Sequence, residues 1–438
     1  MSDDKIVKLD KDKVEKLRKD NEKNTNPNRT MGFDVDKNDN IKSSSVKNAT
    51  LLIQKTPNLN NIFKFNEFTQ EIDVTKDVEL KTSLGNPKIK KGAVTDNVIN
   101  SLELFFEDKN QVAFKNALID QAISNIAHLN SYNPAKDYLL KCYSHWDKKR
   151  RLDNFFPTYL GVEKTDTNIL IARLFFKGVV AKILTPMVKF DFVLDMVGGQ
   201  GVGKTSCFQK IAPCGYYTDQ FNSFTDKDDF QVMKNAVIVN DDEMTASNKA
   251  SFEEVKKFIT MQKFEFRRAY ARKAETFTKK FVLVRTTNER YHLKDRSGDR
   301  RFISLWCDAE RQEKSPITDL TQDEIDQLWG EAMYIYDISK DPFLLSPKEK
   351  AMLARNREEF MYTSGLENSL RDVLDNNFSD KNFITNRELS NALFHDPDAL
   401  SHNSKETRDV RYYMEHLGYD VGVMRKINGL VKRGFEKK

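Results

Sequence analysis

Residues 198–205 read Gly198-Gly199-Gln200-Gly201-Val202-Gly203-Lys204-Thr205, which fits the pattern GxxxxGK(S/T). An apolar run, residues 192–197, precedes them, so the pattern joins a predicted buried strand to a predicted helix. There the glycines turn backbone N–H groups toward phosphates, the lysine reaches the β- and γ-phosphate oxygens, and the threonine hydroxyl ligates Mg²⁺. The alternative is a glycine-rich turn that binds nothing. We predict an ATP and Mg²⁺ site whose nucleotide-binding residues are Gly198, Gly199, Gln200, Gly201, Val202, Gly203, Lys204, Thr205 and Ser206.

An acidic stretch, Asp241-Asp242-Glu243, closes a second apolar run over residues 236–239. A P-loop ATPase needs acidic groups at the end of a neighbouring strand, because one holds hydrated Mg²⁺ and another orients the attacking water. We predict that Asp242 holds the metal together with Thr205 and that Glu243 orients the water. Asp241 is an alternative for the metal, since the strand end cannot be placed to within one residue. The stretch could also be a plain acidic loop.

A third predicted strand, residues 281–284, is followed by Asn288. A polar side chain at that point can touch the γ-phosphate or the attacking water, so we predict a sensor role for Asn288. Asparagine also ends strands for ordinary turn reasons, which is the alternative.

Two adjacent arginines, Arg300 and Arg301, follow a glycine turn. Such a pair suits a clamp on transition-state charge when a neighbouring subunit supplies it, which would make the active form a ring. The alternative is pairing with local carboxylates such as Asp299 and Asp308. The predicted catalytic residues are Lys204, Asp242, Glu243, Asn288, Arg300 and Arg301.

The composition limits the kinds of partner that the protein could bind. The 438 residues carry 71 Lys and Arg against 66 Asp and Glu, a net charge of +5, so nucleic-acid binding would have to come from local basic patches. The cysteines form no CxxC pair and the histidines no HxxxH pair, which argues against a zinc site or disulfides and for a cytoplasmic protein. Lysines and an arginine interrupt the most apolar stretch, residues 169–184, so we expect no membrane segment.

Changes in composition and apolar spacing divide the chain into five predicted parts. They are a mobile polar arm (1–48), a helical N-terminal or collar domain (49–188), a P-loop ATPase core (189–310), a helical connector (311–363) and a winged-helix domain (364–438). The winged helix is predicted from three helical patterns followed by a short β pair around a turn.

Basic residues gather in two of these parts. A basic, aromatic segment between the acidic strand and the sensor strand suits a hairpin that tracks a phosphate backbone. Its candidates for DNA contact are Arg267, Arg268, Arg272 and Lys273; the alternatives are contact with ATP, a ring interface or a solvated face. The third helix and wing of the C-terminal domain add Lys405, Arg408, Arg411, Arg425, Lys426, Lys432 and Arg433. These would position DNA without specifying its sequence, although winged helices also bind proteins.

The order of these motifs resembles the virulence-associated E (VapE-like) family of phage and mobile-element ATPases, which is similar to superfamily 3 and AAA+ replicative helicases. The resemblance covers roughly residues 49–308 and includes Tyr132-Asn133-Pro134 and Tyr159-Leu160-Gly161 upstream. It implies an ATP-driven motor that unwinds DNA in the replication of a phage or genomic island. Relatives usually carry a Glu near Asn240, and many carry an N-terminal primase domain, for which residues 1–48 are too short and too polar.

The sequence thus predicts a multidomain α/β chain with a helical N-terminal domain, a central AAA+ or superfamily 3-like ATPase built on a parallel sheet, and a C-terminal winged helix. The predicted function is a ring-forming DNA helicase, with single-stranded DNA in the pore of a homohexamer and duplex at the winged helix. Primase or polymerase partners would accompany it. The alternatives are a nucleotide-switched initiator or helicase loader and an NTPase that acts on proteins. A small-molecule kinase is disfavoured because no acceptor pocket is recognisable.

Overall fold

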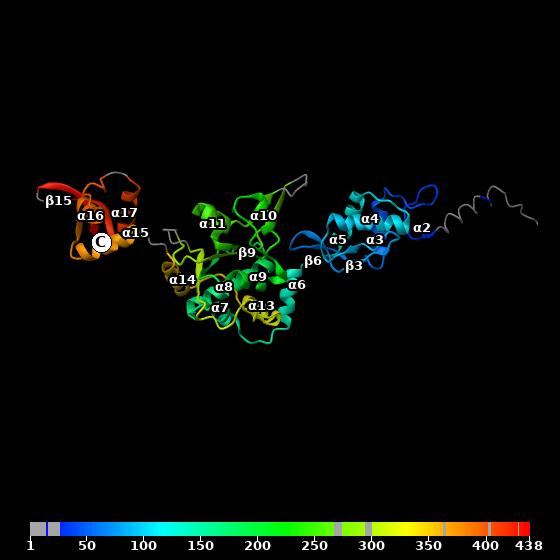
Figure 1. The fold of residues 1–438 in the computed structure, drawn as a ribbon, viewed down its shortest axis with the longest axis horizontal. Helices are drawn as coiled ribbons and strands as arrows, with labels where there is room; N and C mark the ends of the chain where they lie inside the picture. Colours follow the sequence, from blue (N-terminus) through cyan, green and yellow to red (C-terminus); the bar gives the residue numbers. More distant parts are fainter. Residues whose placement is uncertain are drawn as a thin grey trace, which may run out of the picture.

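The structure, a computed structural model, shows three lobes along its long axis (Figure 1). It describes residues 15, 27–266, 274–293, 300–361, 365–401, 404–427 and 429–438. The hairpin candidates Arg267, Arg268, Arg272 and Lys273 lie outside these residues. Among the helices of the described part, none has both the length and the apolar character to cross a membrane.

The N-terminal lobe combines helices with short strands. Its helices are α2 (Pro27–Thr30), α3 (Val46–Lys55), α4 (Asp96–Asn110) and α5 (Asn116–Leu129). Its strands are β1 (Phe63–Asn66), β2 (Glu71–Val74), β3 (Val78–Glu79), β4 (Lys88–Ile89), β5 (Gly92–Ala93) and β6 (Ser131–Tyr132). They form a sheet of order β5-β2-β1-β6 and a β3-β4 pair. The lobe therefore contains more strand than the helical domain expected from the sequence, because strands of two to four residues are too short to show an alternating pattern.

Residues 27–48 differ from the expected mobile arm. Phe33 is buried in the core of the N-terminal lobe. The fully buried Asn48 accepts a hydrogen bond from Asp34 N (2.8 Å) and donates to Asp34 O (2.7 Å) and Lys42 O (3.0 Å). One side chain thus forms hydrogen bonds with backbone N–H and C=O groups of a polar loop, and composition alone does not reveal such an arrangement.

The central lobe contains a five-stranded parallel sheet of order β13-β7-β12-β9-β8, which confirms the predicted α/β architecture. Its strands are β7 (Val193–Gly198), β8 (Tyr217–Thr218), β9 (Ile238–Asp241), β12 (Val282–Thr287) and β13 (Phe302–Cys307). Successive residues of β7 point to opposite faces: Leu194 and Met196 enter one apolar core, and Val193 and Val197 enter another. Burial on both faces explains why the segments 192–197, 236–239 and 281–284 are largely apolar.

Helices cover both faces of this sheet. The first core also holds α6 (Pro134–Ser144), α7 (Leu152–Leu160), α8 (Asp166–Leu184), α9 (Lys204–Ile211) and α13 (Gln322–Asp337). The second holds α10 (Lys227–Met233), α11 (Thr245–Lys249), α12 (Phe252–Thr260) and the hairpin of β10 (Lys263–Phe266) and β11 (Glu275–Thr278). Figure 1 shows α10 and α11 on the opposite side from α7 and α13. Helices expected in the collar (α6–α8) and in the connector (α13) therefore share the core of the sheet.

The N-terminal lobe is joined to the central lobe through the turn after β1. The Phe68 ring stacks on Tyr216 at 4.7 Å, and Asn66 Nδ2 donates to the Tyr216 hydroxyl (2.9 Å). Lys234 Nζ lies 2.8 Å from Glu71 Oε1. These contacts attach the lobe beside β8, the edge strand that follows Tyr216.

The C-terminal lobe has its own core, which includes Leu370, Leu389, Val410 and Phe435. Its elements are α15 (Gly365–Asn377), β14 (Phe383–Thr385), α16 (Asn386–Phe394), α17 (Lys405–His416), β15 (Tyr419–Ile427) and β16 (Leu430–Lys437). The strands form a sheet of order β14-β16-β15. Three helices and a final antiparallel hairpin agree with the sequence prediction, whereas β14, between α15 and α16, is a strand that the sequence did not predict. In the central lobe, α14 (Pro347–Glu359) packs on β13.

Candidate functional site

A cleft of about 340 Å³ opens at the carboxyl ends of β7, β9 and β12. Its lining residues are Gln200, Gly201, Gly203, Lys204, Thr205, Ser206, Asp242, Glu243, Thr286, Thr287, Asn288 and Ile317. Ligands of open parallel sheets bind at this edge. The cleft thus brings together the phosphate-loop, acidic-stretch and sensor residues that the sequence predicts for one site.

Glycine is required at two points of the loop between β7 and α9. Gly203 has φ +85°, and a Cβ there would lie 2.7 Å from Pro316 Cγ. Gly198 has φ +153°, and a Cβ there would lie 2.2 Å from the Cys307 carbonyl oxygen. Left-handed backbone and close packing both exclude larger residues, so the loop keeps its shape against β13 and the segment after it.

Lys204 is buried at the start of α9, with its ammonium held at the loop. Its Nζ donates to Gly198 O (2.6 Å), Gly199 O (2.8 Å) and Asn288 Oδ1 (3.2 Å). Burial lowers the pKa of Lys204, whereas the nearby acids Asp242 and Glu243 oppose that shift. A cation and a strand-end amide that are far apart in sequence therefore face the same point of the cleft.

Asp242 lies where the sequence predicts a metal-side carboxylate. Its Oδ1 accepts hydrogen bonds from Thr205 Oγ1 (2.6 Å) and Thr286 Oγ1 (2.7 Å). A hydroxyl and a carboxylate beside a phosphate loop fit Mg²⁺, which prefers oxygen ligands and is commonly held by one or two carboxylates together with phosphates and water. In the described part of the chain no cluster of three or more His, Cys, Asp or Glu offers a cage for a metal.

Asp241 has a different environment. Its two carboxylate oxygens accept from Ala246 N (2.8 Å) and Ser247 N (2.9 Å) at the start of α11, and the residue is buried. The two acids that the sequence left as alternatives thus differ in their contacts: Asp241 binds backbone N–H groups of α11, and Asp242 accepts from Thr205.

Glu243 lines the cleft from a strained turn. Glu243 and Met244 have φ of +52° and +51°, a conformation that non-glycine residues rarely adopt and that is common at functional sites. The Glu243 backbone N donates to Thr286 Oγ1 (3.0 Å), which also bonds Asp242. Thr286 is not among the site residues predicted from the sequence. Its position at the end of β12, two residues before Asn288, is a signal that could have identified it.

A buried ion pair joins β7 to β12 beneath the cleft. Arg285 donates from Nε and Nη2 to the Asp195 carboxylate at 2.7 and 2.6 Å, and His292 Nε2 lies 2.8 Å from Asp195 Oδ2. Burial alone would raise the pKa of Asp195, but Arg285 and His292 together hold it below its ordinary value. The bidentate pair keeps the sensor strand in register with the phosphate-loop strand.

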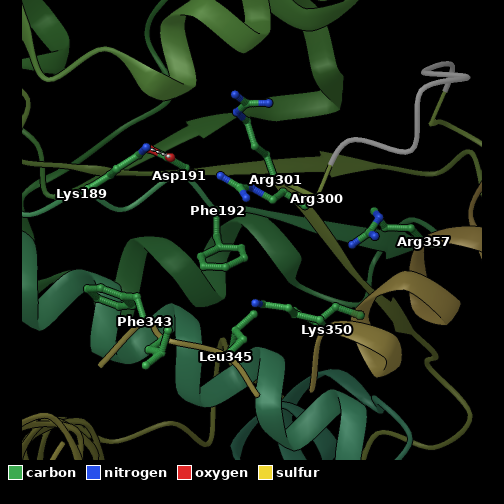
Figure 2. A pocket seen from close by; sticks show the side chains of 11 residues that line it. Lys189, Asp191, Phe192, Arg300, Arg301, Phe343, Leu345, Lys350 and Arg357 are labelled. Carbon is green, nitrogen blue, oxygen red and sulfur yellow. Dashed lines mark ion pairs between the residues drawn. The ribbon is translucent and has the colours of Figure 1, made fainter. Parts of the chain in front are cut away.

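Arg300 and Arg301 line a second cavity, of about 500 Å³, and neither lines the phosphate cleft. Figure 2 shows them near Phe192, Lys350 and Arg357, the last two from α14. The alternative partner Asp308 lies 3.2 Å from Arg311, and Asp299 is outside the described residues.

The basic residues predicted to contact DNA in the C-terminal lobe lie on two elements. Arg408 and Arg411 are one helical turn apart on α17; of Lys405 only the backbone is described. Lys426 and Arg433 are exposed on the β15-β16 hairpin, as are the cross-strand partners Arg425 and Lys432. Arg425 also forms an ion pair with Glu436.

Comparison with known proteins identifies a family to which the chain is similar. The model of the virulence-associated protein E-like domain matches residues 139–362, just over half of the chain. No curated protein matches. Among solved structures, the A form apo structure of the NrS-1 C-terminal region and another apo structure of that region are similar to the chain at 15% and 14% identity. Each alignment covers 86% of this chain and 96% of that chain, with a TM-score of 0.39. From the match of the family model, the chain belongs to the virulence-associated protein E-like family.

Proposed function

We propose that the protein is an ATP-dependent DNA helicase that acts in the replication of a phage or other mobile element. One observation carries the enzymatic part: Lys204, Thr205, Asp242 and Asn288 line one cleft at the carboxyl ends of three neighbouring parallel strands, where Lys204 bonds Asn288 and Thr205 bonds Asp242. Membership of the virulence-associated protein E-like family supports the same conclusion.

Each side chain has a role that follows from its position. Backbone N–H groups of the loop and the start of α9 would bind the phosphates, and Lys204 would neutralise the β- and γ-phosphate oxygens. Thr205 and Asp242 would hold hydrated Mg²⁺, which neutralises charge that develops on the transferred group. Glu243, exposed at the cleft, would orient the attacking water, and Asn288 would contact the γ-phosphate.

The transition-state clamp would come from a second copy of the chain. Arg300 and Arg301 line a different cavity from the phosphate cleft of their own chain, so a neighbour would have to supply them. A closed ring meets this requirement for every subunit, because each subunit then contacts the next in the same way. We propose a homohexamer.

DNA contacts would come from two places. The C-terminal lobe has the element order of a winged helix, with basic residues on α17 and on the β15-β16 hairpin. The segment between β10 and β11, which carries Arg267, Arg268, Arg272 and Lys273, is proposed as the contact to single-stranded DNA in the pore.

The test of this function is ATP hydrolysis with and without single-stranded DNA, beside displacement of a forked duplex at low and moderate salt. We expect stimulated hydrolysis, strand displacement and a rate per chain that rises with protein concentration, because a neighbour completes the site. Hydrolysis with tight duplex binding but no displacement would favour an initiator or helicase loader. If DNA neither stimulates hydrolysis nor binds to the protein, an NTPase that acts on proteins would be favoured.

Replacing Lys426 and Lys432 with alanine is expected to weaken duplex binding to a similar extent for all sequences. Loss of two phosphate contacts should reduce the slope of log K against log salt by about 2. Lys381→Ala is the matched control, because its ammonium lies in the same lobe but pairs with Glu388 at 2.9 Å. An unchanged salt slope in the double variant would contradict a role of this hairpin in DNA binding.

A further inference from the structure

The phosphate cleft has one apolar side chain among its lining residues in the described part of the chain. Ile317 is 55% exposed, whereas the other lining residues are glycines or carry polar or charged groups. A single exposed isoleucine needs no explanation on an open surface. Here, however, Ile317 lies in a polar cleft, and hydrogen bonds and packing fix the backbone around it.

Side chains anchor the segment that carries Ile317 against the phosphate loop. Gln312 Nε2 donates to Val202 O (3.1 Å) and to Tyr159 O (2.7 Å). Lys210 Nζ donates to Ile317 O (2.6 Å), and the Pro316 ring lies over Gly203, where a Cβ would be 2.7 Å from Pro316 Cγ. The backbone of Ile317 is therefore fixed relative to the loop and to α9.

These anchors place Ile317 at a defined end of the cleft. Lys210 and Ser206 are four residues apart on α9 and so share a helix face, which puts Ile317 on the Ser206 side. Asp242, which bonds Thr205, and Asn288, which bonds Lys204, mark the γ-phosphate end. A nucleotide with its terminal phosphate at that end would extend its base toward Ser206 and Ile317.

We propose that Ile317 is the apolar surface on which the base of the bound nucleoside triphosphate packs, with Pro316 and Lys210 as positioning residues. This inference rests on the proposed function, because it presumes that the triphosphate occupies the loop. An aliphatic side chain contacts the flat face of a base without reading its edge. Ile317 therefore contributes affinity for purine nucleotides and does not distinguish adenine from guanine.

The test compares binding of Mg²⁺-ATP with binding of inorganic tripolyphosphate, which has the phosphates but no base. Ile317→Ala is expected to weaken ATP binding about tenfold and to leave tripolyphosphate binding within about twofold of wild type. Because the base contact is the same in the ground state and the transition state, KM for ATP should rise with kcat unchanged. GTP binding should weaken by the same factor, and Ile317→Leu should restore ATP binding.

The control is Ile338→Ala, since Ile338 is similarly exposed (60%) at the end of α13 and does not line the cleft. Equal loss of ATP and tripolyphosphate binding in Ile317→Ala, or no loss of either, would overturn the inference. Wild-type protein that binds tripolyphosphate as tightly as ATP would overturn it while leaving the phosphate site in place. Wild-type protein that binds neither ligand would overturn the proposed function as well.

Discussion

Replacing Lys204 with alanine is expected to abolish ATP hydrolysis and strand displacement while leaving DNA binding largely intact. The Lys204 ammonium is held among Gly198 O, Gly199 O and Asn288 Oδ1, so its charge lies where the β- and γ-phosphate oxygens would be. Removal of one preorganised group of this kind costs on the order of 100- to 1,000-fold in rate. The measurement is the steady-state rate of phosphate release with and without single-stranded DNA.

The control for this variant is Lys141→Ala, an exposed lysine of α6 in the same lobe. Its activity should match wild type, which shows that loss of one positive charge from the lobe is not by itself inhibitory. DNA affinity at low salt should be the same for wild type and Lys204→Ala, because the proposed DNA contacts lie on other elements. Strand displacement that survives in Lys204→Ala would remove the motor interpretation.

Asp242→Ala is expected to reduce hydrolysis at least about 100-fold with little loss of stability, whereas Asp241→Ala is expected to act mainly on stability. Asp242 Oδ1 contacts the Thr205 hydroxyl, so its loss would remove a ligand to hydrated Mg²⁺. The buried Asp241 accepts from Ala246 N and Ser247 N, and removing it would leave two donors without that acceptor. We expect the free energy of unfolding to fall by about 1–3 kcal/mol in that variant.

Both variants are compared in one experiment, with hydrolysis measured across a Mg²⁺ titration and stability measured by denaturant unfolding. Asp242→Asn should retain the shape of the site and need more Mg²⁺ for half-maximal rate. Abolished hydrolysis with unchanged stability in Asp241→Ala, together with an active Asp242→Ala, would reverse the two assignments.

Three strands of the central sheet, β7, β9 and β12, were predictable because their signals are local, whereas β8 and β13 were not predicted. Strands buried on both faces read as apolar runs, which residues 236–239 and 281–284 show directly and residues 192–197 show apart from Asp195. The phosphate loop was predictable for the same reason, since glycine and lysine spacing within eight residues encodes the turn between β7 and α9. Polar residues that end neighbouring parallel strands meet at one edge, so the grouping of Asp242 and Asn288 followed from the strands.

Other features depend on partners distant in sequence. The strands β2 to β6 of the N-terminal lobe are so short that pairing with one another, rather than any pattern of their own, determines their structure. The boundaries between the collar, the ATPase core and the connector were also not visible locally. The sequences of α6–α8 and α13 have helical spacing, which indicates an apolar face but does not indicate which core that face joins.

The sequence by itself determined the phosphate loop, three of the buried parallel strands, the acidic stretch, and the three helices and final hairpin of the C-terminal lobe, since each depends on spacing within a few residues. Only the tertiary structure distinguished the contacts of Asp241 from those of Asp242, brought Thr286 to both Asp242 and Glu243, and held Ile317 beside the phosphate loop. The physical reason is that a hydrogen bond between side chains depends on their separation in space, and that separation is decided by how the whole chain packs.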